Sequence, residues 1–376
     1  MRKLIIGNGN VTRALLAILD SIGERRDITV CDSREGMPGE RMIREHHDCF
    51  DAVLNLSSAP TGALIDLCER YGLDYLDTAY SWPGNEGIRI AEYADSIRGE
   101  LRPREGVALL HGFGMNPGLV EIVPALYAPK RPYFALEIDT DTAEAVSADA
   151  PKVWGTWCPE GHWEEIAHLS GACSTRDAFL KEIPDALHYG RRLAAGGREF
   201  DFTVTAHDET GYMVAYDPNC RGAVFLYAAP RVIGEHFRAL LAAGRELEEG
   251  VPVLHDLKGE ECVGVAFYDG TDASIRYVMN RGDHAKAFRA FGCNGTCWQV
   301  ACGVYAGMRL LELVGKGESL TVSSAMRIPA YRACILSALE RVGFSFETLD
   351  GYLDASQVRS QIMPLFASSC PLPETG

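Results

Sequence analysis

The chain has 376 residues, 47% of them hydrophobic, and a net charge of −16. This length suggests about two to three domains with a substantial core, and the acidic balance argues against a nucleic-acid partner, because phosphate contacts need clustered lysines and arginines. No apolar run reaches the roughly 18–20 residues of a membrane helix and no secretory leader is visible, so we expect a cytoplasmic protein without a membrane partner.

Strands and helices alternate over the first third of the chain, a pattern typical of a doubly wound parallel sheet. The expected strands are Lys3–Ile6, Ile28–Asp32, Ala52–Leu56, Asp74–Thr78 and Val107–Gly112. The expected helices are Val11–Leu19, Thr61–Gly72, Glu86–Ile97 and Asn116–Tyr127.

After about Pro129 the pattern changes to longer strands, which indicates a mixed or antiparallel sheet. The expected strands there are Tyr133–Thr140, Glu199–His207 and Gly222–Pro230, and helices return at Trp298–Val314 and Ile328–Gly343. The predicted fold class is therefore α/β: an N-terminal Rossmann-type doubly wound sheet and a second α+β domain. We expect the first domain at 1–128, completed by 294–345, the second at 129–293 and a tail at 346–376. The final LPETG matches a sortase sorting signal but lacks the apolar segment and basic tail of a real one, so we expect no sorting role for it.

The first predicted turn has the features of a dinucleotide-binding loop. Gly7 would make the tight turn and Gly9 would let the backbone approach a pyrophosphate at the free N–H groups of a helix. Thr12 stands where the third glycine of that motif is usual. Further candidates for cofactor contacts are Asn10, Val11, Asp32, Asn55, Ser57 and Thr78.

The acid that ends the second strand indicates which dinucleotide would bind. Asp32 can bind both ribose hydroxyls, which favours NAD over NADP, whereas Arg34 works the other way because an arginine there can hold a 2′-phosphate. A glycine turn without a ligand is the structural alternative for the loop. Turn-forming hydroxyls are the alternative for Ser57 and Thr78.

Aromatic and acidic residues gather in the second part of the chain. Trp154–Glu165 contains three tryptophans and ends in two glutamates, a composition that can hold an ammonium group. His207 and Glu209 follow a predicted strand on which they would point the same way, and could bind an amine and move its proton. Tryptophan packing against the first domain and a structural histidine are the alternatives.

Two other groups of residues are expected to be structural. Glu260 and Glu261 precede a predicted strand and are more readily explained as solvated acids than as ligands. The twelve cysteines include no CxxC pair, and no His or Asp is placed to complete a zinc set near Cys293, Cys297 and Cys302. We expect reduced thiols and no metal site.

The order of the motifs resembles that of the bacterial homospermidine synthases, which belong to the saccharopine dehydrogenase-like group. The segments that carry the resemblance are GNGNVTRALL, VLNLSS, YLDTAYSWPG, GFGMNPGLV, the TW…G…EE stretch, HDE, FLYAAP, GEECVGVAFY and NGTCWQVACGVYAG. They run from about residue 3 to 312, so the resemblance covers most of the chain.

The resemblance implies an NAD-dependent homodimeric enzyme of polyamine synthesis. Putrescine, or spermidine as donor, is oxidised to an imine, its aminobutyl group passes to a second putrescine, and the Schiff base is reduced to homospermidine. The implied catalytic residues are Asn116, Glu164, Glu165, His207 and Glu209. The resemblance also implies Glu260 or Glu261 as a substrate-binding acid. Trp82, Trp157 and Trp163 are further candidates for substrate binding, and Asn116 and Pro117 join the candidate cofactor contacts.

Several departures from the family pattern keep alternatives open. In the family a glutamate usually precedes Pro-Trp at the position where this chain has Ser81-Trp82-Pro83, and Glu86 is the nearest acid that could replace it. The family's Gly-Trp-Gly-Thr-His-Glu motif has no clear counterpart in this chain. One alternative is a saccharopine or carboxyspermidine dehydrogenase-like enzyme, which would need a placed arginine such as Arg176 or Arg221. Another is a non-catalytic NAD-binding protein.

The segment GFGMNPGLV joins the last predicted strand of the first domain to its helix. Gly112 and Gly114 would let the backbone crowd a ligand. Asn116 would cap the helix, with Pro117 at its first position, or contact the substrate.

Overall fold

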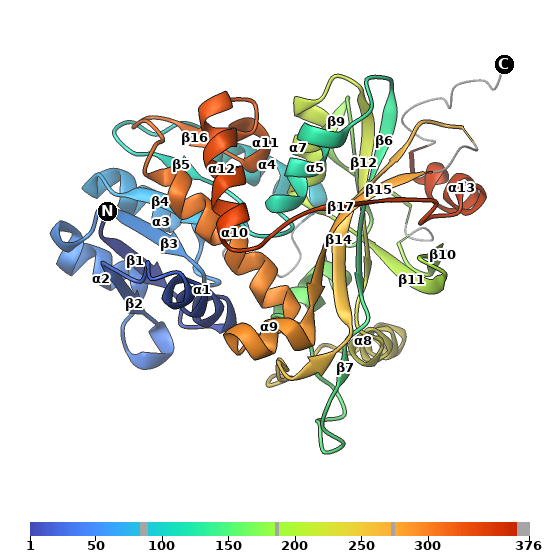
Figure 1. Ribbon diagram of the computed structural model, residues 1–376, viewed down its shortest axis with the longest axis horizontal. Helices are drawn as coiled ribbons and strands as arrows, with labels where there is room; N and C mark the ends of the chain where they lie inside the picture. The colour runs from blue at the N-terminus through green and yellow to red at the C-terminus, as the bar shows by residue number, and fades with distance from the viewer. Residues whose placement is uncertain (83–88, 185–187, 272–274, 367–376) are drawn as a thin grey trace. The chain divides into compact units, whose positions relative to one another are not determined.

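The computed structural model describes residues 1–82, 89–184, 188–271 and 275–366 (Figure 1). Pro83, Glu86 and the LPETG end therefore lie outside the described residues. The first unit comprises Met1–Asn85, Ser96–Ile122 and Ala287–Ser345. The second comprises Glu86–Asp95, Val123–Lys286 and Phe346–Gly376.

The first unit contains a six-stranded parallel sheet in the order β2-β1-β3-β4-β5-β16. Its strands are β1 (Lys3–Ile6), β2 (Ile28–Cys31), β3 (Ala52–Asn55), β4 (Asp74–Asp77), β5 (Leu109–Leu110) and β16 (Ser319–Leu320). Strands β1, β3 and β4 are buried along their whole length, as expected for parallel strands covered on both faces. The strand order reverses direction between β1 and β3, and such a switch point is where doubly wound sheets bind ligands.

The helices of the first unit are α1 (Asn10–Ser21), α2 (Gly39–His46), α3 (Thr61–Tyr71), α10 (Gly295–Leu311), α11 (Val322–Ala325) and α12 (Pro329–Arg341), with α4 (Ile90–Glu100) shared between the units. Helices α1, α3, α10 and α12 lie close to predicted positions, whereas α2 and α11 were not predicted. Helix α10 packs against α1 and β4, as the sequence predicted for the returning helix. Gly303 also lets α10 approach the loop after β5, because a Cβ on Gly303 would lie 2.1 Å from the carbonyl oxygen of Gly114.

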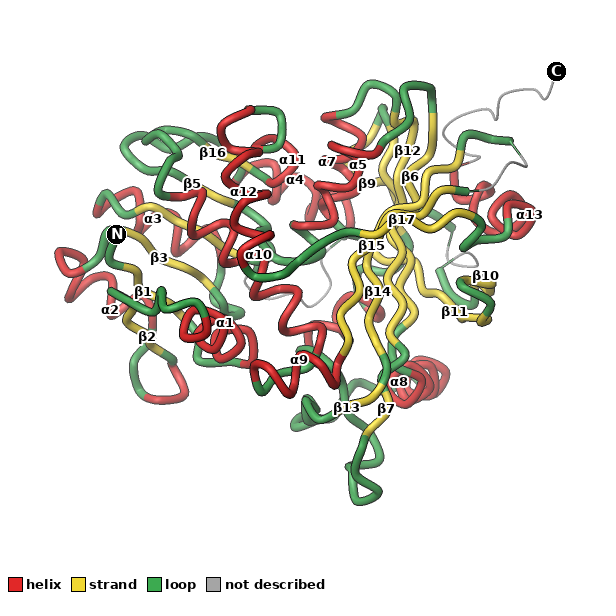
Figure 2. Tube along the Cα trace, viewed as in Figure 1, coloured by secondary structure: helices red, strands yellow, loops and turns green. Residues whose placement is uncertain are grey.

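The second unit contains a mixed nine-stranded sheet, whose long strands are drawn in yellow in Figure 2. Its main path runs β10 (Arg191–Ala195), β11 (Arg198–Thr205), β12 (Cys220–Ala228), β6 (Tyr133–Asp141), β14 (Glu260–Tyr268), β15 (Arg276–Asp283) and β17 (Glu347–Asp350). Strands β8 (Ala172–Thr175) and β9 (Ala178–Glu182) extend it, and β7 (Glu144–Ala145) pairs with β13 (Leu257–Lys258). The predicted α/β class with a second, mixed-sheet part is confirmed.

The helices of the second unit are α6 (Pro159–Ala167), α7 (Asp208–Tyr216), α8 (Arg231–Ala243) and the short α13 (Ala355–Gln357). Helices α5 (Ile122–Tyr127) and α9 (His284–Phe291) lie at the junctions of the two ranges. Segment 346–366 joins the second unit, where β17 pairs with β15. None of the helices in the described residues is long and apolar enough to span a membrane.

Two local predictions are wrong. His207 and Glu209 do not share a strand, because β11 ends at Thr205 and His207 is the residue that precedes helix α7. Asn116 does not cap a helix with Pro117 at its first position: the peptide between them is cis, and a 3-10 turn starts only at Leu119, before α5. Glu209 instead lies in the first turn of α7, and Asn116 lies in a loop.

Candidate functional site

The loop after β1 has the geometry expected for holding a phosphate. Gly7 has a φ of +102°, and a Cβ there would lie 2.5 Å from the carbonyl oxygen of Leu56, so only glycine fits. A Cβ placed on Gly9 would meet no atom of the described residues within 4 Å, which leaves this side of the loop open at the N-terminus of α1. Thr12 fills the third glycine position, is fully buried and donates its hydroxyl to the carbonyl of Gly7 at 2.7 Å.

The polar residues after β3 hold their own turn. The Ser57 hydroxyl donates to Oδ1 of Asn55 at 2.8 Å, and Nδ2 of Asn55 donates to the carbonyl of Ala59 and to the Tyr75 hydroxyl. These bonds support the turn-forming interpretation of Ser57. Both residues still lie at the switch point, where their turn borders the loop containing Gly7.

The segment GFGMNPGLV forms a tight backbone loop at the carboxyl end of β5. Asp77 accepts the N–H of Gly112 at 2.7 Å, and the N–H of Gly114 donates to the carbonyl of Pro117. A Cβ on Gly114 would lie 3.0 Å from the carbonyl oxygen of Thr78, so this loop packs against the end of β4. The candidates Thr78, Asn116 and Pro117 are thereby held at one edge of the first sheet.

A second cluster lies in the second unit, on one face of strand β6. Alternate residues of a strand point to opposite faces, so Glu137, Asp139 and Asp141 share a face while Phe134, Leu136 and Ile138 enter the hydrophobic core. All three acids are at least 96% buried. Helix α7 packs against β6 and β12, and α6 against β11, so these helices cover the sheet near the acids.

His207 is the centre of this acidic cluster. Its Nδ1 lies 2.9 Å from Oε1 of Glu209 and its Nε2 lies 3.5 Å from Oε1 of Glu165, so two carboxylates flank one imidazole. Burial alone would lower the pKa of His207, but Glu209 and Glu165 outweigh burial and raise this pKa well above its usual value. The Phe225 ring lies 3.9 Å from the imidazole, a further contact that suits a cation.

Glu137 is the most unusual member of the cluster. It is fully buried, neither of its oxygens has a hydrogen-bond donor among the described residues, and the side chain that approaches it is the equally buried Glu209. Burial and the charge of Glu209 raise the pKa of Glu137 well above its usual range. The neighbouring Asp208 has its pKa raised to about 7, first by burial and then by Glu209. Glu137 was not among the residues predicted from the sequence, although acids at alternate positions of YFALEIDTD were a visible signal.

The two acids at the start of β14 separate onto opposite faces. Glu261 pairs with Asp141 in the strand register and is 2% exposed, so it extends the acidic face. Glu260 instead forms a partly exposed ion pair with Arg281. The interpretation of both residues as solvated acids therefore fits Glu260 but not Glu261.

Asp141 differs from Glu137 because its charge is balanced. It accepts the Thr156 hydroxyl at 2.8 Å and lies 3.0 Å from Nε2 of His284, and both ionisable side chains are fully buried. Burial opposes the charged form of His284, but Asp141 and Glu261 outweigh burial and raise its pKa. The uncompensated acid of the face therefore lies at its other end, at Glu137.

The predicted tryptophans have different surroundings. Trp157 donates from its indole N–H to the hydroxyl of Tyr227, which sits beside Asp139 in the strand register, so Trp157 lies near the acidic face. Trp163 is buried against Phe237 and donates to Glu246, which indicates packing. Trp82 belongs to the first unit, where its ring is 6.5 Å from that of Tyr80. Of the two predicted glutamates on α6, Glu165 is the one that contacts His207.

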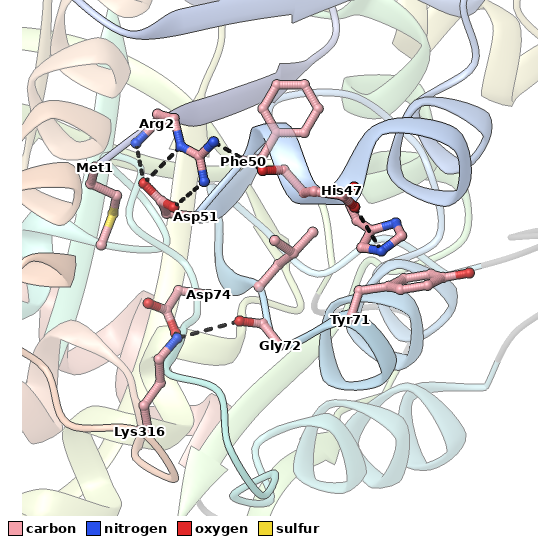
Figure 3. A pocket seen from close by; sticks show the side chains of 11 residues that line it. Met1, Arg2, His47, Phe50, Asp51, Tyr71, Gly72, Asp74 and Lys316 are labelled. Atoms are coloured by element: carbon pink, nitrogen blue, oxygen red, sulfur yellow. Dashed lines mark hydrogen bonds and ion pairs between the residues drawn. The ribbon is translucent and has the colours of Figure 1, made fainter.

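A surface hollow of about 480 Å³ lies at the amino ends of the strands in the first unit. Figure 3 shows that its charged side chains are paired, Arg2 with Asp51 and Lys316 with Asp74. This edge is opposite the carboxyl ends at which doubly wound sheets bind ligands. The hollow therefore offers neither an open cation nor the expected position of the site.

Two solved structures share the fold of this chain. One is the homospermidine synthase of Legionella pneumophila in complex with NAD, with a TM-score of 0.71, 13% identity, and coverage of 93% of this chain and 91% of that chain. The other is an apo saccharopine dehydrogenase (L-Glu forming) from Saccharomyces cerevisiae, with a TM-score of 0.59, 10% identity, and coverage of 93% and 99%. No protein-family model and no curated protein sequence matches the chain. The resemblance read from the motifs is thus confirmed at the level of the fold.

Proposed function

We propose that the protein is an NAD-dependent enzyme of the homospermidine synthase type, which acts on the C–N bonds of diamines. Two putrescine molecules would give one homospermidine and one ammonia. The donor carbon loses a hydride and its nitrogen a proton, the acceptor amine adds to the imine with loss of ammonia, and the new Schiff base regains the hydride. NAD would accept and return that hydride.

The observation that carries this proposal is the buried and incompletely paired acid cluster around Glu137. Burying a carboxyl group without a donor costs several kcal/mol, and the packing of the sheet does not require it. Strained or costly polar groups of this kind concentrate at functional sites. A cationic amine supplies the donors and the charge that the cluster lacks.

The spacing of the acids suits a short diamine. Alternate residues of a strand are about 6.6 Å apart, so Glu137 and Asp139 are separated by roughly this distance along β6. A four-carbon diamine has five single bonds between its nitrogens and extends to about 6 Å, by the same bond geometry that gives the chain its reach. The face therefore suits two ammonium groups at the separation found in putrescine.

The residues around His207 would handle protons. A reacting ammonium group must lose a proton before hydride can leave its carbon. Because His207 favours its protonated form, the flanking carboxylates of Glu165 and Glu209 are the bases, and the imidazolium holds both in position. Glu165 has 20% of its side chain exposed and can exchange the proton with water, whereas Glu209 is fully buried.

The first unit has residues that fit the dinucleotide. The opening above Gly9 and the N–H groups at Asn10 and Val11 would take the pyrophosphate, and Asp32 would face the ribose. Asn116 and Pro117 stay proposed contacts for the nicotinamide end. A homodimer and a cytoplasmic location are further parts of the proposal that rest on the family resemblance.

The alternatives explain the cluster less well. A saccharopine-type substrate carries carboxylates and needs a placed cation, but Arg176 is exposed and donates to the backbone carbonyl of Pro218. A non-catalytic NAD-binding protein would gain nothing from the buried acids. Neither alternative accounts for the unpaired carboxyl of Glu137.

Incubation of the purified protein with NAD and putrescine, followed by amine chromatography and an ammonia assay, tests the proposal. Homospermidine and ammonia should form in equal amounts without net accumulation of NADH. E261Q should lose most activity, whereas E260Q, which alters the adjacent acid on the other face, should keep it. Turnover of saccharopine but not of putrescine or spermidine would show that the proposed reaction is wrong.

A further inference from the structure

Arg34 lies on the acid that ends the second strand. Asp32 follows β2, and Arg34 sits in the 3-10 turn at Ser33–Glu35. The guanidinium of Arg34 donates from Nε to Oδ1 of Asp32 at 3.0 Å and from Nη2 to Oδ2 at 2.8 Å. This two-point contact covers the carboxylate at the end of β2 that would face the cofactor's ribose.

The carboxylate of Asp32 is fully engaged within the chain. In addition to the guanidinium, the backbone N–H groups of Arg34 and Asn8 donate to it, each at 2.8 Å. Hydrogen bonding by Arg34 and then by Asn8 holds the pKa of Asp32 well below its usual range, so the group is ionised at neutral pH. A carboxylate has about four acceptor positions, and four N–H groups occupy them. Ribose hydroxyls can bind only if the guanidinium leaves.

The charges around Asp32 affect whether the site can bind a ribose that carries a 2′-phosphate. Glu35 is close, because its Oε1 accepts Nδ2 of Asn8 at 2.8 Å. With Arg34 in place the local charge is −1, from Asp32, Glu35 and Arg34 together, and without Arg34 it would be −2. A 2′-phosphate carries about −1.5 to −2 charge itself, so Arg34 reduces the repulsion, and its N–H groups that do not face Asp32 can donate to the phosphate. The unmodified ribose of NAD is uncharged and does not experience this repulsion.

We propose that Arg34 determines the choice between the two dinucleotides and gives this site the capacity to bind NADP as well as NAD. In contact with Asp32 it shields the acid and presents a cation to a 2′-phosphate. Turned away, it exposes Asp32 to the two ribose hydroxyls of NAD, and its side chain, which is 74% exposed, can turn into solvent. The inference rests on the dinucleotide site of the proposed function.

Binding titrations of NADH and NADPH, followed by ligand fluorescence or calorimetry, test the inference without an assay of turnover. The wild type should bind both with dissociation constants within about tenfold of each other. R34A should bind NADPH about 10–100-fold more weakly, the range for loss of a charge-assisted contact, and NADH equally or more tightly. D32N should shift the preference in the opposite direction.

R41A is the matched control, since Arg41 is an exposed arginine paired with Glu45 on α2 in the same unit. It should leave both affinities unchanged, and equal melting temperatures should establish that every variant is folded. If the wild type binds NADH and R34A leaves the ratio of the two affinities unchanged, the role of Arg34 is wrong while the proposed function stands. If the wild type binds neither dinucleotide, both fail, and if both bind without amine turnover, only the proposed reaction fails.

Discussion

Replacement of Glu137 by glutamine should stabilise the protein without ligand, and the gain should grow as the pH rises. The ordinary pKa of a glutamate is 4.5, and burial next to Glu209 raises that of Glu137 well above this value. At pH values between 4.5 and the raised pKa, Glu137 holds a proton in the folded state that it has released in the unfolded state. Increasing pH therefore favours unfolding of the wild type, whereas the amide of the E137Q variant has no proton to lose.

The size of the effect follows from proton linkage. One proton retained only in the folded state changes the free energy of unfolding by about 1.36 kcal/mol per pH unit. Over about 1.5 pH units inside that window, E137Q should gain about 2 kcal/mol on the wild type. For a unit of this size, each kcal/mol shifts the melting temperature by about 2–4 °C, so the difference should widen by roughly 4–8 °C.

Thermal melts of the wild type and E137Q over a series of pH values above 4.5, with and without putrescine, measure this difference. Putrescine should raise the melting temperature of the wild type more at higher pH, because an ammonium group stabilises the ionised form of Glu137, and should have little effect on E137Q. E260Q controls for loss of an acid from the surface of the same sheet. A stability difference between E137Q and the wild type that does not change with pH, or one that narrows as the pH rises, would refute the reasoning.

Four further variants test three separate parts of the structure. H284A should destabilise the protein by about 3–5 kcal/mol in urea denaturation, because it leaves Asp141 buried without its partner, and a loss below about 1 kcal/mol would refute this account of the pair. H207N should reduce amine turnover at least about 100-fold while leaving NADH affinity within about twofold, and equal loss of both would indicate a structural role. G7A should lower the melting temperature, because its Cβ clashes with the backbone at Leu56. G9A should fold normally but bind NADH at least about tenfold more weakly. The reverse pattern would show that the loop after β1 is not the dinucleotide-binding loop.

The first unit was predictable because its signals are local. A short apolar strand, a glycine turn and a helix with apolar periodicity recur at regular spacing, and β1, α1, β3 and α3 follow from this pattern. The errors occur where tertiary contacts determine the backbone. The segment around Asn116 forms a glycine loop packed against α10 at Gly303, and the contact between Gly114 and Gly303 is not visible in either segment alone.

The burial of the acids on strand β6 could not be predicted from the sequence. In YFALEIDTD, apolar residues alternate with Glu137, Asp139 and Asp141, and a half-exposed strand with its acids in water would have the same pattern. The interpretation changes only when β6 is found between β12 and β14 and the acids prove to be buried. A pattern that would be ordinary at the surface is costly in the interior, and the cost is highest at Glu137, which has no donor among the described residues. For this reason the proposed amine site depends on strand β6, which the motif resemblance did not include, rather than on the His207–Glu209 pair alone.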